Sequence, residues 1–308
     1  MRYRTLGRTG LTVSVVGVGT YQFGGEWGKS FRAREVREIL AAAADCGINL
    51  IDTAECYGDH LAEQLVGAAL RGRRSDWVIA TKFGHHFHGF QERSDHWRPQ
   101  EVRRQIQDSL RALRTDYVDL LQFHSPDHDQ FVTEGLWELL VHEKEAGRVR
   151  HVGISVASSA CAASDTSQLE SAGEVPLEAA QVVYNLLERQ VEIQILPTCR
   201  RRELGVLARV PLASGLLSGK YTAAHSFPPD DVRAHRPPGE LETALAEARR
   251  IEAEELPAGV PLGVWSLAWC LRHPGITAVI PGCKSREQVL GNACAAELVA
   301  PGHPQEAP

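Results

Sequence analysis

The sequence predicts one α/β domain whose eight parallel strands close into a barrel. Strand-like and helix-like segments alternate eight times along the 308 residues, as is typical of repeated β/α units. No dinucleotide-binding fingerprint is present, because Gln22 stands where a third glycine should follow Gly17-Val18-Gly19. Ionisable residues stand at the C-terminal ends of successive strands, the end of such a barrel that carries its chemistry. These three observations favour a (β/α)₈ TIM barrel over a doubly wound sheet.

Length and composition fit a single domain that handles small molecules. A chain of this length is ordinary for one barrel, here expected over 1–308, and its hydrophobic fraction of 43% suffices for a large core. The net charge of −6 gives no general attraction to nucleic acid or to anionic membranes. The N-terminus lacks the apolar core of a signal peptide. The seven cysteines include no C-x-x-C pair, which favours reduced thiols in a cytoplasmic protein. The sequence leaves the oligomeric state open.

The elements follow from periodicity and turn residues. Residues 3–14 predict a hairpin with its turn at Gly7–Gly10, and apolar residues at helical spacing predict the first helix over 34–46. The barrel strands are expected at 15–20, 49–51, 77–84, 118–124, 150–155, 180–185, 204–210 and 276–282. Further helices are expected at 61–70, 99–113, 240–256, 263–271, and from 136 and 286 onward. Residues 84–99 predict a loop over the mouth, 219–238 a lid or a disordered connection, and 300–308 a mobile tail.

Three successive strands each end in a residue that can carry a charge. The first ends at Asp52, with Tyr57 five residues later, the second carries Lys82, and the third ends at His124. For Asp52 taken alone, an alternative is that it caps the next helix. Because the C-terminal ends of barrel strands meet at one mouth, we expect the four side chains to form one site.

In these four positions and their order the sequence resembles the aldo-keto reductase superfamily, from about Tyr3 to about Ala296. The resemblance implies that Asp52, Tyr57, Lys82 and His124 are catalytic. A free tyrosine has a pKa near ~10, and a nearby ammonium from Lys82 is expected to lower that pKa. Asp52 would hold the lysine, and His124 would orient a carbonyl oxygen. None of the four can carry hydride, so an organic cofactor is required, and the resemblance implies a nicotinamide.

The resemblance also implies where the cofactor binds. Ser155 and Gln181 match positions that hold the carboxamide, although Val156 replaces a frequent Asn, and Arg209-Val210 stands where many members have a stacking aromatic. Lys284 and Arg286 at a helix start suit a 2′-phosphate, which favours NADPH over NADH. The complete set expected to bind NADP(H) is Gly19, Thr20, Tyr21, Asp52, Ser155, Gln181, Val210, Pro211, Leu212, Ser214, Gly215, Leu216, Lys220, Ile280, Gly282, Lys284, Arg286, Gln288 and Asn292.

The sequence also predicts the residues of the substrate pocket and the function, and for both it leaves alternatives open. Phe23, Trp27 and His85 are expected to wall the pocket; for the two aromatic residues, packing within their own loop is an equal alternative. The histidines between 85 and 96 lack a metal-binding pattern, so no metal is expected. We expect a cytoplasmic oxidoreductase that reduces an aldehyde or ketone to an alcohol with NADPH, and no nucleic-acid or membrane partner. The alternatives are an NADPH-binding regulatory subunit with little turnover, and a barrel hydrolase that uses Asp52 and His124.

Overall fold

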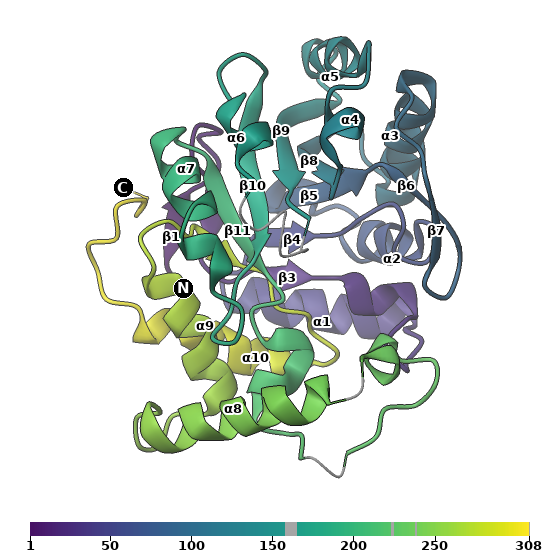
Figure 1. The fold of residues 1–308 in the computed structure, drawn as a ribbon. Coiled ribbons are helices and arrows are strands. Elements are labelled where there is room, and N and C mark those ends of the chain that lie inside the picture. Colours follow the sequence, from purple (N-terminus) through teal and green to yellow (C-terminus); the bar gives the residue numbers. More distant parts are fainter. Residues whose placement is uncertain (158–164, 223–224, 238, 308) are drawn as a thin grey trace.

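Eight parallel strands form the centre of the computed structural model, which describes residues 1–157, 165–222, 225–237 and 239–307. Their order in the sheet is β3 (Val18–Gly19), β4 (Leu50–Asp52), β5 (Val78–Phe83), β8 (Val118–His124), β9 (Val149–Ser155), β10 (Leu177–Val183), β11 (Gly205–Arg209) and β12 (Ala278–Val279). Parallel bridges from Val16 to Val279 and from Gly19 to Gly282 join the two ends of this order. The predicted (β/α)₈ barrel is therefore confirmed (Figure 1).

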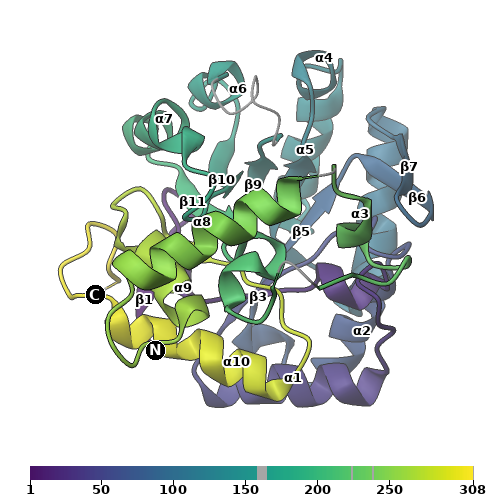
Figure 2. The same ribbon diagram turned by 60° about the horizontal axis from the view of Figure 1, so that its bottom comes forward.

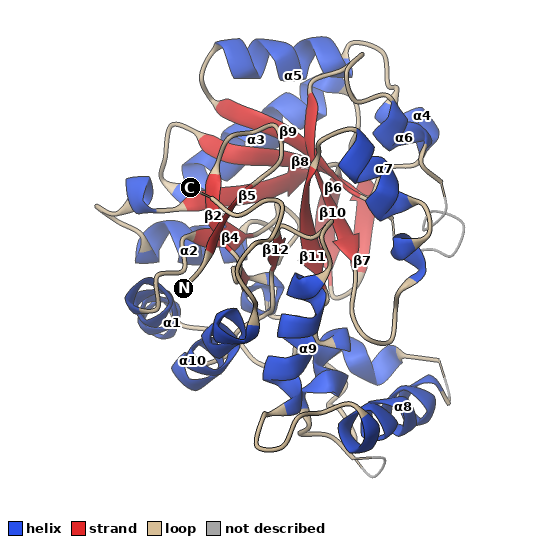
Figure 3. Cartoon of the chain, turned by 90° about the vertical axis from the view of Figure 1, so that its left-hand side faces the viewer, coloured by secondary structure: helices blue, strands red, loops and turns tan. Residues whose placement is uncertain are grey.

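Helices surround the strands, as Figure 3 shows. They are α1 (Ala33–Asp45), α2 (Leu61–Ala69), α3 (Pro99–Leu113), α4 (His128–Phe131), α5 (Leu136–Glu145), α6 (Ser167–Glu170), α7 (Ile195–Arg201), α8 (Glu240–Glu254), α9 (Leu262–Arg272) and α10 (Arg286–Ala293). In α3 the proline occupies the first turn, where no backbone donor is needed, and buried Val102 and Ile106 face the strands. None of the helices in the described part of the chain is long and apolar enough to cross a membrane.

The additional helix α8 lies outside the regular β/α alternation. It packs on α9 and on the 3₁₀ segment Ala213–Ser218 through a separate apolar cluster that includes Leu245, Ile251 and Trp265. Figures 1 and 2 both show α8 beside α9. This cluster supports the segment that follows β11, which borders the site described below.

The barrel interior changes from apolar to polar toward the C-terminal ends of the strands. One buried apolar cluster contains Leu50, Ala80, Leu120, Ala179 and Leu207. Because side chains along a strand alternate between two faces, the residues two positions later enter the same interior. Those residues are Asp52, Lys82, Gln122, Gln181 and Arg209. The fold thus places a layer of polar side chains directly above an apolar floor.

Two segments differ from expectation. Residues 84–99, expected to be a loop, contain an antiparallel hairpin, β6 (His85–Gly89) with β7 (Glu92–Asp95). The tail 300–308 was expected to be mobile, but its described part, 300–307, lies along the predicted N-terminal hairpin, β1 (Tyr3–Thr5) with β2 (Thr12–Ser14). Thr5 N donates to Gln305 O (2.9 Å) and Ala307 N donates to Tyr3 O (3.1 Å). In both places the backbone donors and acceptors find partners that side-chain periodicity does not reveal.

Candidate active site

Asp52 and Lys82 form a buried ion pair in the polar layer. Lys82 Nζ donates to Asp52 Oδ2 (2.8 Å) and to Thr53 O (2.8 Å), and its side chain is 1% exposed. The other carboxylate oxygen, Oδ1, accepts from Gln181 Nε2 (2.6 Å) and Gln122 Nε2 (3.3 Å). A buried charge is tolerated only when it is paired and hydrogen-bonded, and here both charges are. The pair is therefore fixed in position.

The Tyr57 hydroxyl lies above this pair. Lys82 Nζ is 3.2 Å from Tyr57 Oη, and the tyrosine ring packs on Tyr21 with centroids 4.8 Å apart. Burial raises the pKa of Tyr57 well above its ordinary value of 10, and the negative charge of Asp52 adds to this. The expected lowering of this pKa below its ordinary value is not found, because burial and nearby negative charges outweigh the cations around the hydroxyl. Tyr57 is therefore a protonated phenol, a hydrogen-bond donor, at neutral pH.

His124 lies beside a buried carboxylate. Its Nδ1 is 3.4 Å from Glu55 Oε1 and 3.6 Å from Cys56 Sγ. Burial lowers the pKa of His124 to about 4, although Glu55 opposes this. Burial by itself raises the pKa of Glu55, but the charge of His124 and contacts with His85 outweigh it, so that this pKa falls to about 2. At neutral pH a neutral imidazole thus faces an anionic carboxylate, which can only accept, so the proton lies on Nδ1 and Nε2 is an acceptor.

Glu55, Cys56 and His124 place three ligand-type atoms within 4.8 Å of one another. Burial strongly raises the pKa of the Cys56 thiol, and a metal requires the thiolate. Arg93 also adds a positive charge near the sulfur. These features disfavour a metal at this cluster.

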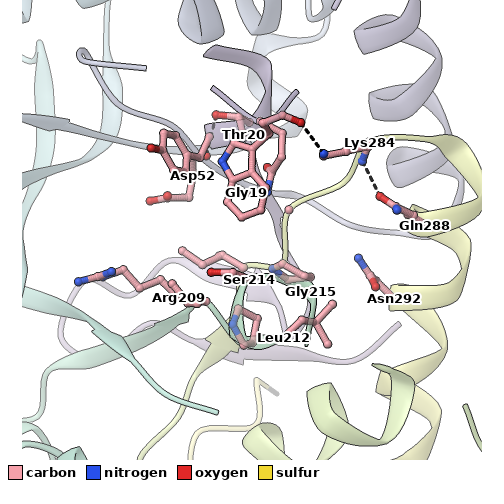
Figure 4. A pocket seen from close by; sticks show the side chains of 18 of the residues that line it. Gly19, Thr20, Asp52, Arg209, Leu212, Ser214, Gly215, Lys284, Gln288 and Asn292 are labelled. Carbon is pink, nitrogen blue, oxygen red and sulfur yellow. Dashed lines mark hydrogen bonds between the residues drawn. The ribbon is translucent and has the colours of Figure 1, made fainter. Parts of the chain in front are cut away.

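A cavity of about 750 Å³ extends from Tyr57 to the start of α10, within the usual size of ligand pockets. Figure 4 shows Asp52 and Arg209 at one end of it, and Lys284, Gln288 and Asn292 at the other. Most residues expected to bind the cofactor line this cavity: Gly19, Thr20, Tyr21, Asp52, Gln181, Val210, Pro211, Leu212, Ser214, Gly215, Lys220, Ile280, Gly282, Lys284, Gln288 and Asn292. Trp27 and His85, expected to wall the substrate pocket, line it as well.

Five expected site residues lie outside the lining. Lys82 is one of them, since it is buried beneath Tyr57 and Asp52. Ser155 and Leu216 are buried, the latter in the cluster under α8. Phe23 is fully buried against Phe31, with ring centroids 4.9 Å apart, so the alternative that it packs its own loop holds. Arg286 is exposed, because two helical steps of about 100° carry it away from the face that Gln288 presents to the cavity.

The far end of the cavity is closed by contacts between distant parts of the chain. Lys284 Nζ donates to Trp27 O (2.8 Å), and Lys284 N donates to Gln288 Oε1 (2.7 Å). Trp27 also forms an antiparallel bridge with Asp231 of the connection 219–238. The buried Arg233 forms a two-pronged pair with Asp231, and its guanidinium carbon lies 4.7 Å from the centroid of the Trp27 ring. We name residues 24–28 together with 228–233 the strap.

The segment after β11 carries unusual backbone conformations. Val210, Ala213 and Ser214 have positive φ values of 55°, 47° and 57°. Such conformations are rare for non-glycine residues and cluster at functional sites. Together with Gly215, at φ 95°, they place small residues and backbone along one wall of the cavity.

Several residues of the site were not anticipated. Gln122 could have been found, because it alternates with Leu120 and His124 on one strand. Arg93 lines the cavity from β7 and pairs with the buried Glu26. Arg233 lies in the strap. For these two arginines the sequence carries no periodic signal, because both stand in segments expected to be loops.

A family model and curated relatives are similar to this chain over most of its length. The model of the "Aldo/keto reductase family" matches residues 15–301. The aldo-keto reductase YhdN of Bacillus subtilis is 31% identical over 94% of this chain and 87% of its own length. A probable voltage-gated potassium channel subunit beta of Oryza sativa is 30% identical, over 97% of this chain and 92% of its own length.

Solved structures are similar over nearly the whole chain. A glycerol dehydrogenase from Gluconobacter oxydans matches with a TM-score of 0.82 and 30% identity, covering 96% of this chain and 90% of that one. An aldo-keto reductase from Klebsiella pneumoniae, solved in complex with NADPH, matches with a TM-score of 0.71 and 26% identity, covering 98% and 92%. With the barrel, the four residues at its mouth and the family match in agreement, the chain belongs to the aldo-keto reductase family.

Proposed function

We propose that this protein reduces an aldehyde or ketone to an alcohol with NADPH, and that Tyr57 is the general acid. The observation that carries this is the Tyr57 hydroxyl, a protonated phenol 3.2 Å from the Lys82 ammonium. It faces the cavity of about 750 Å³, which extends from Tyr57 to Lys284, Gln288 and Asn292 at the start of α10.

The residues of the cavity suit a phosphorylated dinucleotide. Lys284 and the N-terminus of α10 offer a positive charge and free backbone donors to an anion at one end. Lys220 and the backbone of the segment after β11 border the middle, and Gln181 lies at the reactive end. The NADPH bound to the Klebsiella relative supports this choice of cofactor. When bound, NADPH supplies the hydride.

The protein's own part in the reaction is to hold and move a proton. A carbonyl oxygen near Tyr57 Oη gains negative charge as the adjoining carbon is reduced, and it takes the phenolic proton. The phenolate left behind lies within 3.2 Å of Lys82 Nζ, which stabilises the new charge. Asp52 keeps the ammonium charged and in place. His124 Nε2, an acceptor, can receive the hydroxyl of the alcohol product.

Replacing Tyr57 by Phe tests the assignment. The variant should lose about 10²–10⁴-fold in kcat for carbonyl reduction, while NADPH still quenches tryptophan fluorescence with a similar Kd. Wild-type turnover should first be measured as NADPH oxidation with a panel of aldehydes and ketones. A Tyr57→Phe variant with wild-type kcat would remove Tyr57 from the role of acid.

The similarity to the potassium channel subunit supports a second candidate, an NADPH-binding regulatory subunit with little turnover. The two candidates differ in one measurement. If NADPH binds tightly and no carbonyl compound in the panel is reduced, the regulatory function replaces the enzymatic one.

A further inference from the structure

Arg209 is a cation at the reactive end of the cavity. It is the last residue of β11, two positions after the interior residue Leu207, so its side chain enters the barrel mouth on the same level as Asp52. It lines the cavity together with Tyr57 and Gln181. Figure 4 shows it at the same end of the cavity as Asp52.

The other cations around the reactive end have carboxylate partners, and Arg209 does not. Lys82 pairs with Asp52, and Arg93 pairs with Glu26. Within the described ranges Arg209 has no ion-pair partner. Its Nη2 donates to Val156 O (3.2 Å), and its Nε is buried without a hydrogen-bond partner.

Arg209 is partly exposed to the cavity, while its Nε atom is buried without a hydrogen-bond partner. A guanidinium in this state, with no carboxylate partner, would be stabilised by a ligand that binds against it. Burial lowers the pKa of Arg209, but an arginine side chain keeps its proton at neutral pH. Among the surrounding groups, Tyr57, Asp52 and Glu188 act on its charge, in that order. Asp52 is already balanced by Lys82, and Glu188 forms no ion pair with Arg209 in the described ranges, so the guanidinium presents its charge to whatever binds next to Tyr57.

The proposed function brings the nicotinamide ring to this place. Hydride must reach the carbon bonded to the oxygen that takes the proton of Tyr57, so the ring has to lie within one carbonyl group of that hydroxyl. Arg209 borders the cavity there, and a flat guanidinium can stack on an aromatic ring. The ring is neutral in NADPH and carries a positive charge in NADP⁺.

We propose that Arg209 discriminates between the two redox forms of the cofactor, favouring the neutral dihydronicotinamide and disfavouring the cationic ring. This inference rests on the proposed function, to which it adds a preference of the site for one redox form of the cofactor. The overall equilibrium of the reaction is unchanged. The consequence is that NADPH occupies the site even where NADP⁺ is abundant, and that NADP⁺ leaves readily after reduction.

The test is the ratio of the dissociation constants of NADP⁺ and NADPH, measured by calorimetry for wild type, Arg209→Met and Arg209→Lys. Two like charges in contact near a protein surface repel strongly enough to weaken binding by about tenfold or more. We therefore expect Arg209→Met to bind NADP⁺ about tenfold more tightly and to change NADPH binding by less than about threefold. Arg209→Lys keeps the charge and should keep most of the wild-type ratio. Urea unfolding verifies that both variants are folded.

Three outcomes would overturn the inference. The first is a ratio of dissociation constants in Arg209→Met equal to that of the wild type. The second is a change of this ratio in Arg209→Lys as large as in Arg209→Met, which would show that the shape of the side chain, and not its charge, is decisive. The third is an unchanged ratio together with a raised KM that is confined to carboxylate-bearing aldehydes, which would assign Arg209 to a substrate anion. A wild-type protein that binds neither cofactor form would instead reject the proposed function.

Discussion

The two ends of the cavity are built from different kinds of contact. At the reactive end, side chains from neighbouring strands hold one another: Lys82 makes three hydrogen bonds, to Asp52, Thr53 and Tyr57. At the far end, Lys284 reaches the carbonyl of Trp27, and the strap is held by one bridge and one arginine pair. Rigid strands thus position the groups that move a proton, while loops enclose the rest of the ligand.

The lysines at the two ends of the cavity are in opposite electrostatic states. Lys82 is 1% exposed and fully paired, so it serves as a fixed charge. Lys284 is partly exposed, has no carboxylate partner in the described part of the chain, and has its pKa lowered by burial and by Arg233. An anion that binds beside Lys284 would therefore stabilise its ammonium group, whereas the charge of Lys82 is already compensated by Asp52.

Breaking the ion pair at the reactive end should have the largest effect on stability. Lys82→Met leaves Asp52 as an uncompensated buried charge, which should lower the free energy of unfolding by about 3–5 kcal/mol. Urea denaturation measures this. Lys29→Met is the control, because its partner Glu35 is exposed and the change should be small. Equal losses in the two variants would show that the buried pair is no more important to the fold than an exposed one.

The pH dependence of stability should originate at the reactive end. The pKa of His124 is about 4 in the folded protein and about 6.5 when unfolded. The unfolded chain therefore binds more protons between these values, so the stability contributed here is complete above pH 6.5 and is lost as the pH falls toward 4. His124→Gln should reduce the loss of unfolding free energy between pH 7 and pH 4.5 by on the order of 1–3 kcal/mol.

Urea unfolding at the two pH values measures this effect, and His142→Gln, on a helix at the surface, provides the control. A loss of stability in His124→Gln as large as in wild type would place the acid sensitivity elsewhere. The pKa of Glu55 is depressed to about 2, so its own contribution is lost at lower pH, between about 4.5 and 2.

At the far end, one of two basic residues should set the cofactor preference. Lys284 lines the cavity and Arg286 is exposed. Lys284→Ala should reduce the preference for NADPH over NADH about tenfold, equivalent to about 1.4 kcal/mol, whereas Arg286→Ala should leave it nearly unchanged. Dissociation constants of both cofactors for the two variants decide this. A larger effect of Arg286→Ala would mean that the phosphate lies on the outer face of α10.

Much of the reactive end was predictable because it depends on local order. Asp52, Lys82 and His124 stand at strand ends, and the strand period of two places them inside the barrel. The hairpin β6–β7 and the strap were not predictable, because polar and histidine-rich segments have no core-facing period. The exposed position of Arg286 was not predictable, because the pattern at a helix start shows which charges are present and not which of them faces the cavity.

The sequence alone determined the barrel, its N-terminal hairpin and the order of the four residues at the mouth, because alternating strand and helix periods and parallel strand ends follow from local pattern. Only the tertiary structure decided that Tyr57 stays protonated, that Lys284 meets Trp27 across 257 residues of chain, and that Arg209 has no carboxylate beside it in the described ranges. These properties depend on burial and on partners from distant segments. The distance between such partners is set when the barrel closes, and it cannot be obtained from the local pattern of the sequence.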